Sequence, residues 1–306
     1  MRVVSILPSA TEILYALGVE PVGVSHECDY PPAAASVPAV NRSRVDPEAG
    51  SDEINDQVDE AVADHGSVYE IDDETLRDLD PDVVVTQGVC DVCAVDRVLV
   101  REAVERLDLD CDVLTTDPHS LADVLADVER FGEVLGRQEQ ARAVVAELRD
   151  RIERVEERVA LADRRPRVSV LDWMDPVMVA GHWMPDLVER AGGTYGITEP
   201  GAHSVPLEWD VVREFDPEVL VAAPCGFDVD HALRDVADLT GREGWADLAA
   251  VREGAAYAMD GNQYVNRPGP RLVDTLEYLA SVIHPDQFES PPADAVRPIE
   301  TPHVEI

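Results

Sequence analysis

The sequence predicts an α/β protein built from two Rossmann-like lobes with mainly parallel sheets, joined by a long bridging α-helix. Short buried strands alternate with amphipathic helices, one helical stripe is much longer than the rest, and segments of the first half recur in the second. At 306 residues the chain is long enough for two ordinary domains. We expect an N-terminal lobe at 1–118, linking helices at 119–165, a C-terminal lobe at 166–285 and a Pro-rich tail at 286–306.

The N-terminal lobe opens with a strand, a helix and a second strand. The helix is expected at Thr11–Leu17, where Gly18 ends it. A surface helix is expected where Asp52 and Glu53 precede apolar residues at every fourth position. Strands are predicted at Val3–Leu7, Val22–Ser25, Val83–Thr86 and Val113–Thr115.

The linking region is helical. Ser120 is a plausible N-cap, and an apolar stripe follows it as far as Phe131. After Gly136 the stripe resumes from Arg137 to about Ala162, on the order of 39 Å of helix at 1.5 Å per residue. Glu and Arg at helical spacing occupy its other face, as on a solvated side. We interpret this helix as a rigid bridge between the lobes.

Segments of the second half of the sequence resemble segments of the first half. LRDLDPDVVV at 76–85 matches VREFDPEVLV at 212–221, and the opening RVVSIL parallels RVSVLDW from Arg167. Asp-Pro before a strand is common turn chemistry, but two echoes in the same order favour duplicated lobes. The segment after Pro285 has several prolines and no periodicity, which is typical of a tail.

The charge balance excludes several partners. Asp and Glu number 63 against 25 basic residues, for a net charge of −38, and no Lys occurs. A chain without a basic stripe is not expected to bind nucleic acid or an anionic membrane. Acids spread along the whole chain predict a halophilic protein, because concentrated salt screens their repulsion. The alternative is an acidic patch for one cationic partner.

The first residues predict no targeting segment. A strand-like run follows Met1 directly, and no stretch of 18 apolar residues exists. The chain as given is therefore expected in the cytoplasm, or outside it if an export signal has been trimmed. Five Cys are too few for a disulfide scaffold, and an odd number leaves at least one unpaired.

Loops beyond strand ends are where ligands bind in open parallel sheets, and four such loops carry special residues. The pair Cys90 and Cys93 has the spacing for one soft metal, and Cys28 and Cys225 could complete a zinc or iron-sulfur site. A reversible disulfide between Cys90 and Cys93, or simple packing of thiols, remains an alternative.

Histidines and aromatic residues in these loops are candidates for binding a ligand. His26 and His182 could act as axial metal ligands or general bases, although loop histidines are often only structural. Flat rings suit a large ring-shaped ligand, while some of them could instead cover the core. The aromatic candidates are Tyr30, Trp173, Trp183, Phe227 and Tyr264.

Catalytic motifs are missing from the sequence. It has no GxSxG elbow, no HExxH, no GxxxxGK[ST] loop and no GxGxxG after a strand. We therefore predict a binding protein rather than an enzyme. An enzyme with His26 or His182 as its base stays open, as does a cytosolic metalloprotein with metal on the four Cys.

The sequence resembles the class III substrate-binding proteins of ABC transporters, in the cobalamin-binding branch of the iron-siderophore and vitamin B12 family. The carrying stretches are VVSILPSATEILYALG, VGVSHECDYPP, LRDLDPDVVV and YAMDGNQYVNRPGPRLVDTLEYLA. The resemblance implies a bilobed monomer that holds a corrinoid between its lobes and works with an ABC permease. Family ligand contacts match Asp29, Tyr30 and Arg267, while Gln263 and Tyr264 replace the acidic and Trp positions before that arginine.

These observations predict a non-catalytic protein that binds cobalamin, or a related corrinoid or metal chelate, in the interlobe cleft. It would serve as the substrate-binding component of an ABC importer or as an intracellular carrier. A chelatase or corrinoid-modifying enzyme that uses His26 or His182 as its base is the enzymatic alternative. Stacking and apolar contact over a large ring would supply the binding, and a few polar groups would fix its orientation.

Overall fold

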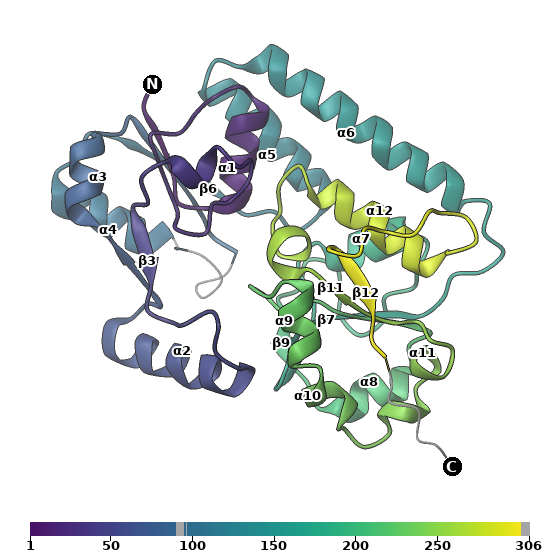
Figure 1. Ribbon diagram of the computed structural model, residues 1–306. Coiled ribbons are helices and arrows are strands. Elements are labelled where there is room, and N and C mark those ends of the chain that lie inside the picture. The colour runs from purple at the N-terminus through teal and green to yellow at the C-terminus, as the bar shows by residue number, and fades with distance from the viewer. Residues whose placement is uncertain (90–94, 96, 301–306) are drawn as a thin grey trace. The chain divides into compact units, whose positions relative to one another are not determined.

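The computed structural model describes residues 1–89, 95 and 97–300 (Figure 1). Internal contacts divide the chain into two compact units. Unit 1 comprises Met1–Pro118 and Ala122–Glu147, and unit 2 comprises His119–Leu121 and Leu148–Ile306. Each unit carries a sheet with parallel strands at its centre and helices around it, so the predicted α/β fold class is confirmed.

Unit 1 contains a four-stranded parallel sheet in the order β2-β1-β5-β6. β1 and β5 are the two central strands and are wholly buried. The strands are β1 (Val3–Ser5), β2 (Gly23–Val24), β5 (Val83–Gln87) and β6 (Asp112–Thr116). The helices of this unit are α1 (Pro8–Ala16), α3 (Asp73–Leu79), α4 (Arg97–Leu107) and α5 (Leu121–Val134), with a 3-10 turn η1 (Ala34–Ser36).

Helix α1 begins three residues earlier than the sequence pattern predicted. Pro8 occupies the first turn, where its missing N–H costs no hydrogen bond and its fixed φ suits the helix. The residues from Pro8 to Leu14 are all buried, including Glu12 at 4% exposure. Because this first part of the helix is buried on every side and includes the polar residues Ser9, Thr11 and Glu12, no amphipathic period marks where it starts.

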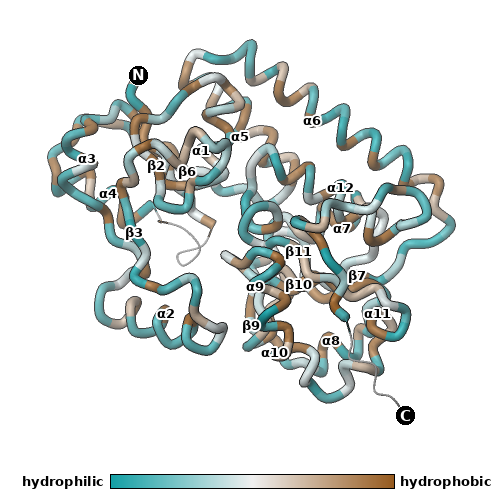
Figure 2. Tube along the Cα trace, in the orientation of Figure 1, coloured by the Kyte–Doolittle hydropathy of each residue, from teal (hydrophilic) through white to brown (hydrophobic). Residues whose placement is uncertain are grey.

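A small antiparallel sheet in unit 1 was not predicted. Strand β3 (Asn41–Ser43) pairs with β4 (Tyr69–Ile71), and the two flank α2 (Ser51–His65). Helix α2 carries the expected surface pattern, since within it only Ser51 and Ala61 are buried. Figure 2 shows its mostly hydrophilic trace.

Unit 2 contains a mixed sheet in the order β12-β11-β10-β7-β8-β9. The three middle strands β11, β10 and β7 run parallel, and β12, β8 and β9 are antiparallel to their neighbours. The strands are β7 (Val168–Met174), β8 (Val177–Val179), β9 (Val205–Pro206), β10 (Val219–Ala222), β11 (Ala256–Met259) and β12 (Val296–Pro298).

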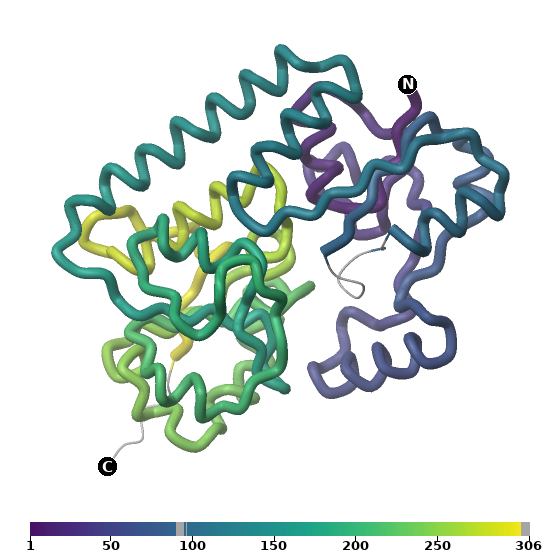
Figure 3. Tube along the Cα trace, turned by 180° about the vertical axis from the view of Figure 1, so that it is seen from behind, coloured from purple at the N-terminus to yellow at the C-terminus, as the bar shows by residue number. Residues whose placement is uncertain are grey.

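Helices cover this second sheet. Helix α12 lies beside α7, as both views of the chain show (Figures 1 and 3). The helices are α7 (Met184–Arg190), α8 (Trp209–Phe215), α9 (Val229–Arg234), α10 (Ala237–Thr240), α11 (Ala249–Arg252) and α12 (Leu272–Ile283), with a 3-10 turn η2 (Trp245–Asp247) and one π-helical turn η3 (Gly261–Val265).

The long helix predicted from Arg137 is α6 (Gln138–Val159). Its trace alternates hydrophobic and hydrophilic residues at helical spacing (Figure 2). From Leu148 onward it belongs to unit 2, where Arg151 forms ion pairs with Asp274 and Glu277 of α12. The apolar stripe was visible in the sequence, but these partners, more than 120 residues away, were not.

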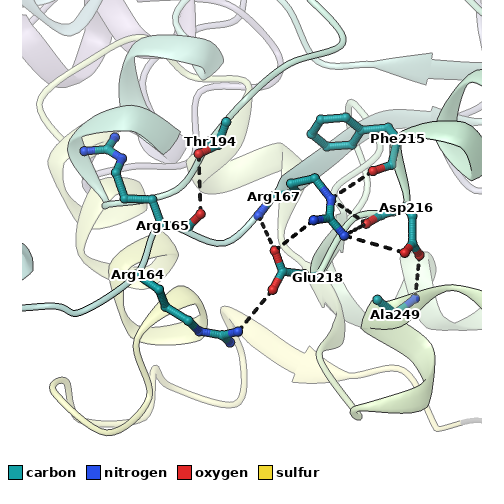
Figure 4. Close-up of polar contacts among 8 residues, drawn as sticks. All are labelled: Arg164, Arg165, Arg167, Thr194, Phe215, Asp216, Glu218 and Ala249. Atoms are coloured by element: carbon teal, nitrogen blue, oxygen red, sulfur yellow. Dashed lines mark hydrogen bonds and ion pairs between the residues drawn. The ribbon is translucent and has the colours of Figure 1, made fainter.

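The predicted duplication is present in the hydrogen bonding of each unit. The amide of Arg2 donates to Asp82 Oδ2 and its Nε to Leu79 O, at 2.5 and 2.7 Å. The amide of Arg167 donates to Glu218 Oε2 at 3.1 Å, and its Nε to Phe215 O at 3.0 Å (Figure 4). Strand register repeats as well, with Val3 opposite Val83 and Val168 opposite Val219.

The segment expected as a Pro-rich tail contributes to the second sheet. Strand β12 pairs antiparallel with β11, and Ala295 and Val296 are buried. Three residues are too few to display a period, which explains why the strand was not predicted. Within the described ranges, no helix is both long and apolar enough to cross a membrane.

Candidate functional site

Three loops meet at the carboxyl edge of the parallel strands in unit 2. They follow β7, β10 and β11, and hydrogen bonds tie the last two together. The amides of Gly261 and Asn262 donate to Phe227 O at 2.9 and 3.1 Å, and Asn266 Nδ2 donates to Ala223 O at 3.3 Å. This edge is where an open α/β sheet offers space to a ligand.

Gly261 permits the close approach of these loops. A Cβ at this position would lie 2.1 Å from Pro224 O and 2.5 Å from Ala223 O, both of them backbone atoms. Only glycine fits such a contact without moving the chain. The π-helical turn η3 can therefore pack directly on the loop after β10.

Two of the predicted aromatic residues lie together at this edge, Trp173 near the end of strand β7 and Phe227 in the loop after β10. The rings of Trp173 and Phe227 are 5.4 Å apart between centroids and tilted by 60°. Phe227 also stacks on His231 at 3.6 Å and 8°, and it is 2% exposed. Trp173 is only partly buried, and its Nε1 donates to Asp175 O at 3.0 Å. The Trp173 ring thus keeps some accessible surface, and the buried Phe227 ring packs against it.

Trp183 has a supporting position. It is 6% exposed, and its indole Nε1 donates to Val265 O at 2.9 Å, at the end of η3. Its buried ring holds the loop after β11 in place.

A charged cluster follows β11. Asp260 is 1% exposed and accepts hydrogen bonds from the amide of Gln263 at 2.6 Å and from its Nε2 at 3.2 Å. Arg267 Nη2 donates to Asn262 Oδ1 at 3.1 Å, and Arg271 Nη1 donates to Gln263 Oε1 at 3.3 Å. Both arginines are buried, at 4% and 8% exposure.

The carboxyl group of Asp260 is perturbed by this environment. Burial raises its pKa to about 6, against the opposing effects of the Gln263 amide and of Arg267 and Arg271. Two guanidinium groups, those of Arg267 and Arg271, therefore lie near this carboxyl, and Asp228 is a second acidic group close to it. Arginine in such a position suits a carboxylate or phosphate group.

Tyr264 lies at the outer end of the same cluster. Its ring makes an edge contact with Tyr278 at 5.2 Å, and the Arg271 guanidinium lies 5.4 Å from its centroid. Burial raises the pKa of both tyrosines, so both phenols are protonated at neutral pH. Gln263 and Tyr264 therefore form one network with the buried arginines.

Unit 1 presents its own carboxyl-edge loop after β2. His26, Asp29 and Tyr30 are exposed there, with Tyr30 at 44%. The amide of His26 donates to Asn41 Oδ1 at 3.2 Å, and its ring lies 6.1 Å from that of Tyr69. These contacts attach the loop to the β3-β4 sheet.

The four-Cys metal site stays a prediction. Cys90 and Cys93 lie outside the described residues. Cys28 is buried beside Val24 and Ala34, with its Sγ 3.1 Å from Thr11 Oγ1. Cys225 belongs to the other unit and is partly buried. Among the residues the structure describes, no group of three or more His, Cys, Asp or Glu is arranged to hold a metal ion.

His182 lies in the loop after β8, where its ring contacts those of His119 and His203. Sequence reasoning did not select those two histidines, nor Asp260, Asn262, Asn266 and Arg271. No helical periodicity pointed to Arg271, because Arg267 lies in the loop before α12 and Arg271 is the N-cap of that helix.

The chain matches the sequence model of one known protein family over most of its length. The model of the periplasmic binding protein family matches residues 3–262. An uncharacterized ABC transporter substrate-binding lipoprotein, YvrC of Bacillus subtilis, is 25% identical over 94% of this chain and 81% of its own length. The vitamin B12-binding protein of Vibrio cholerae is 23% identical over 92% and 88%.

Solved structures show the same fold. A periplasmic heme binding protein from Pseudomonas aeruginosa superposes with a TM-score of 0.72 at 21% identity, covering 98% of both chains. The vitamin B12 binding protein BtuF of Vibrio cholerae gives 0.66 at 20% identity, covering 94% of this chain and 97% of its own. Given the extent of the family match and this shared architecture, the chain belongs to the periplasmic binding protein family.

Proposed function

We propose that this protein binds a metal tetrapyrrole, either cobalamin or a heme-like ring, as the substrate-binding component of an ABC importer. The observation that carries the proposal is the arrangement at the carboxyl edge of unit 2. There the partly exposed ring of Trp173 is fixed by Phe227, on the same group of loops that carries Arg267.

The chemistry of these loops suits a large flat ligand. An indole face offers stacking area at small entropic cost, because its own orientation is already fixed by a hydrogen bond. Arg267, on the same loops, carries the type of charged group that suits an anionic substituent of such a ring. In unit 1, Asp29 and Tyr30 are exposed on a loop at the corresponding edge of its sheet.

The named relatives support this class of ligand. One relative is named as a vitamin B12-binding protein and one structural neighbour as a heme-binding protein. Both of these ligands hold a metal ion in a tetrapyrrole-type ring. A third relative is described as a lipoprotein. This relative supports the proposal that the protein works on the outer side of the cytoplasmic membrane with a permease as its partner.

Spectroscopic titration tests the proposal. Cyanocobalamin and hemin are each added to micromolar protein in molar KCl, and the corrin or Soret band and the tryptophan fluorescence are followed. One of the two ligands is expected to bind at a ratio of one to one with a Kd of about 1 µM or less, equivalent to about 8 kcal/mol. The absence of a saturable signal with both ligands contradicts the proposal.

Two matched variants localise the site. Arg267→Ala is expected to weaken binding about tenfold or more, since it removes a charged donor worth about 1.5–3 kcal/mol. Arg164→Ala removes the same charge from an exposed position at the opposite edge of the sheet and leaves the Kd unchanged. Equal effects of both variants would indicate a general electrostatic influence and not a binding site.

A further inference from the structure

Trp173 follows an irregularity in strand β7. The register of β7 on β8 shifts here, with Leu171 opposite Val179 but Trp173 opposite Met178. Two steps along β7 are therefore matched by one step along β8, and Asp172 is the extra residue. Such a bulge bends the strand and changes the direction of the side chains beside it. The direction of the Trp173 ring thus depends on how the bulge and the turn after it are held.

The bulge residue Asp172 is held by neighbouring segments of unit 2. Its carbonyl accepts a hydrogen bond from the amide of Cys225, in the loop after β10, at 3.1 Å. Its Oδ2 accepts a hydrogen bond from Ser204 Oγ, which in turn accepts from the Gly181 amide at 2.9 Å. These contacts hold in place the residue that precedes Trp173.

The turn between β7 and β8 holds the other side of Trp173. The indole Nε1 donates to Asp175 O at 3.0 Å, so the ring is attached to this turn. Arg242 contacts the same turn, because its Nη2 donates to Met174 O at 2.8 Å and to Asp175 Oδ1 at 2.6 Å. One guanidinium nitrogen therefore bonds both to the residue after Trp173 and to the residue whose carbonyl accepts from the indole.

Arg242 is itself supported by aromatic side chains. It lies 67 residues after Asp175, between α10 and η2. Its guanidinium carbon lies 5.8 Å from the centroid of the Trp209 ring, within the range of a cation–π contact. The Trp209 ring stacks with that of Trp245 at 6.3 Å and 24°, and its Nε1 donates to Glu243 O at 3.0 Å. The arginine side chain is only 23% exposed, so its position is fixed from several sides.

The ion pair between Arg242 and Asp175 does not by itself explain this arrangement. The Asp175 side chain is 49% exposed, and an ion pair with so exposed a partner adds little to stability. The same guanidinium also bonds to the carbonyl of Met174, which is a buried residue. A charged donor on a backbone carbonyl fixes the path of the chain, which a surface ion pair does not. The consequence of these contacts is therefore geometrical.

We propose that Arg242 is a positioning residue for ligand binding, which fixes the turn after β7 and through it the direction of the Trp173 ring. The inference rests on the proposed function, in which Trp173 supplies the stacking surface. Arg242 acts on the ligand through the indole. A ring whose orientation is fixed before binding loses less entropy when a flat ligand stacks on it, so this contact raises the affinity.

Fluorescence tests the positioning without any ligand. The chain has four Trp, so each protein is measured with and without Trp173→Phe, and the difference gives the Trp173 signal. Arg242→Ala is expected to increase the quenching of Trp173 by acrylamide and to shift its emission to longer wavelength, because the turn that holds the indole is released. Arg242→Lys keeps the charge but not the planar contact with Trp209, and its signal should lie between those of the wild type and Arg242→Ala.

A matched arginine separates positioning from stability. Arg213 pairs with Asp210 inside its own helix α8 at 2.7 Å, and Arg213→Ala should leave the Trp173 signal unchanged. Urea unfolding of each variant gives its stability, and the fluorescence is compared where all of them are folded. If Arg242→Ala lowers only the free energy of unfolding, or if both variants change the Trp173 signal equally, the proposal is overturned.

Ligand titration tests the consequence for binding. Arg242→Ala should weaken the binding of cyanocobalamin or hemin, whichever binds the wild type, about two- to tenfold, which corresponds to ordering one side chain. The double variant with Trp173→Ala should bind no more weakly than Trp173→Ala alone, since Arg242 acts through that ring. Losses that multiply in the double variant contradict the proposal. If neither ligand binds the wild type, the proposed function fails, while the quenching comparison still decides whether Arg242 positions Trp173.

Discussion

Arg167 and Glu218 are joined through both backbone and side chain at the amino edge of the unit 2 sheet. The Arg167 amide donates to Glu218 Oε2 at 3.1 Å, and the Glu218 amide donates back to Arg167 O at 2.8 Å. The guanidinium of Arg167 also donates to the carbonyls of Phe215 and Asp216, where α8 ends (Figure 4). The Arg167 guanidinium therefore caps the carboxyl end of α8 and stabilises the left-handed Asp216 at φ +47°. The backbone contacts of Arg167 with Glu218 align β7 with β10.

We predict that Arg167→Ala destabilises the protein by about 1–2 kcal/mol, because it removes charged donors from two carbonyl groups. Chemical denaturation measures the effect. Arg164 is the matched control: it also pairs with Glu218, but its side chain is 73% exposed, and Arg164→Ala should cost less than about 0.5 kcal/mol. Equal losses would show that the ion pair, and not the carbonyl contacts, holds this edge.

Asp127→Asn should stabilise the protein above pH 7. Burial raises the pKa of Asp127 to about 6 even though Arg130 is its partner at 2.7 Å. The folded carboxylate therefore costs stability above about pH 6, and this cost is relieved as the pH falls toward the unfolded value near 3.8. Asparagine removes the cost, with a gain of up to about 3 kcal/mol at pH 8. Urea unfolding at pH 8 and pH 5 measures it, and a gain that does not shrink at pH 5 contradicts the assignment.

His284 should make the fold sensitive to mild acid. Burial lowers its pKa below the ordinary value of 6.5, and its Nε2 lies 3.3 Å from Gly192 O. Below about pH 6.5 the unfolded chain takes up a proton that the folded chain does not, so stability is lost as the pH falls, by up to about 1.4 kcal/mol per pH unit. His284→Gln should flatten the unfolding free energy between pH 7 and pH 5, whereas His65→Gln should not.

The titration of Asp260 offers a test of whether the site prefers a heme-like ligand or a corrinoid. Its pKa of about 6 means that it becomes neutral as the pH falls below 6, so that its negative charge no longer offsets the positive charges of Arg267 and Arg271. A ligand with carboxylate substituents should then bind more tightly at pH 5.5 than at pH 7.5, and an amide-substituted corrinoid should change little. Binding of hemin and cyanocobalamin is compared at the two pH values. In Asp260→Asn, which retains an acceptor for the Gln263 amide, any such difference should disappear.

Salt should stabilise this protein strongly. With a net charge of −38, carboxylate repulsion opposes the compact state until ions screen it. We expect the Tm to rise between 0.1 and 2 M KCl, by about 2–4 °C for each kcal/mol gained. Calorimetry at several KCl concentrations measures the rise, and sucrose at equal osmolality controls for general solute effects. A Tm independent of KCl would contradict the halophilic interpretation.

The candidate site was only partly predictable. The residues in loops after strands were found because parallel strands send their loops to one edge, a rule that needs no coordinates. Trp173 and Phe227 were selected in this way, whereas Arg267 was selected through the resemblance to a known family. Trp183 was selected on the same grounds, but its ring is buried and bonded to Val265 O. Local sequence does not distinguish a ring that faces solvent from one that supports the loop above it.

The sequence by itself determined the alternation of strands and helices, the long amphipathic helix, the duplicated Arg–strand and Asp-Pro–strand segments, and the acidic charge. These features arise from neighbours a few residues apart, so periodicity and turn chemistry reveal them. Tertiary structure alone decided that residues 296–298 complete a sheet, that Asp260 is buried beside two arginines, and that His119, His182 and His203 meet. Burial and contact between distant segments depend on how the whole chain packs, and no local pattern encodes them.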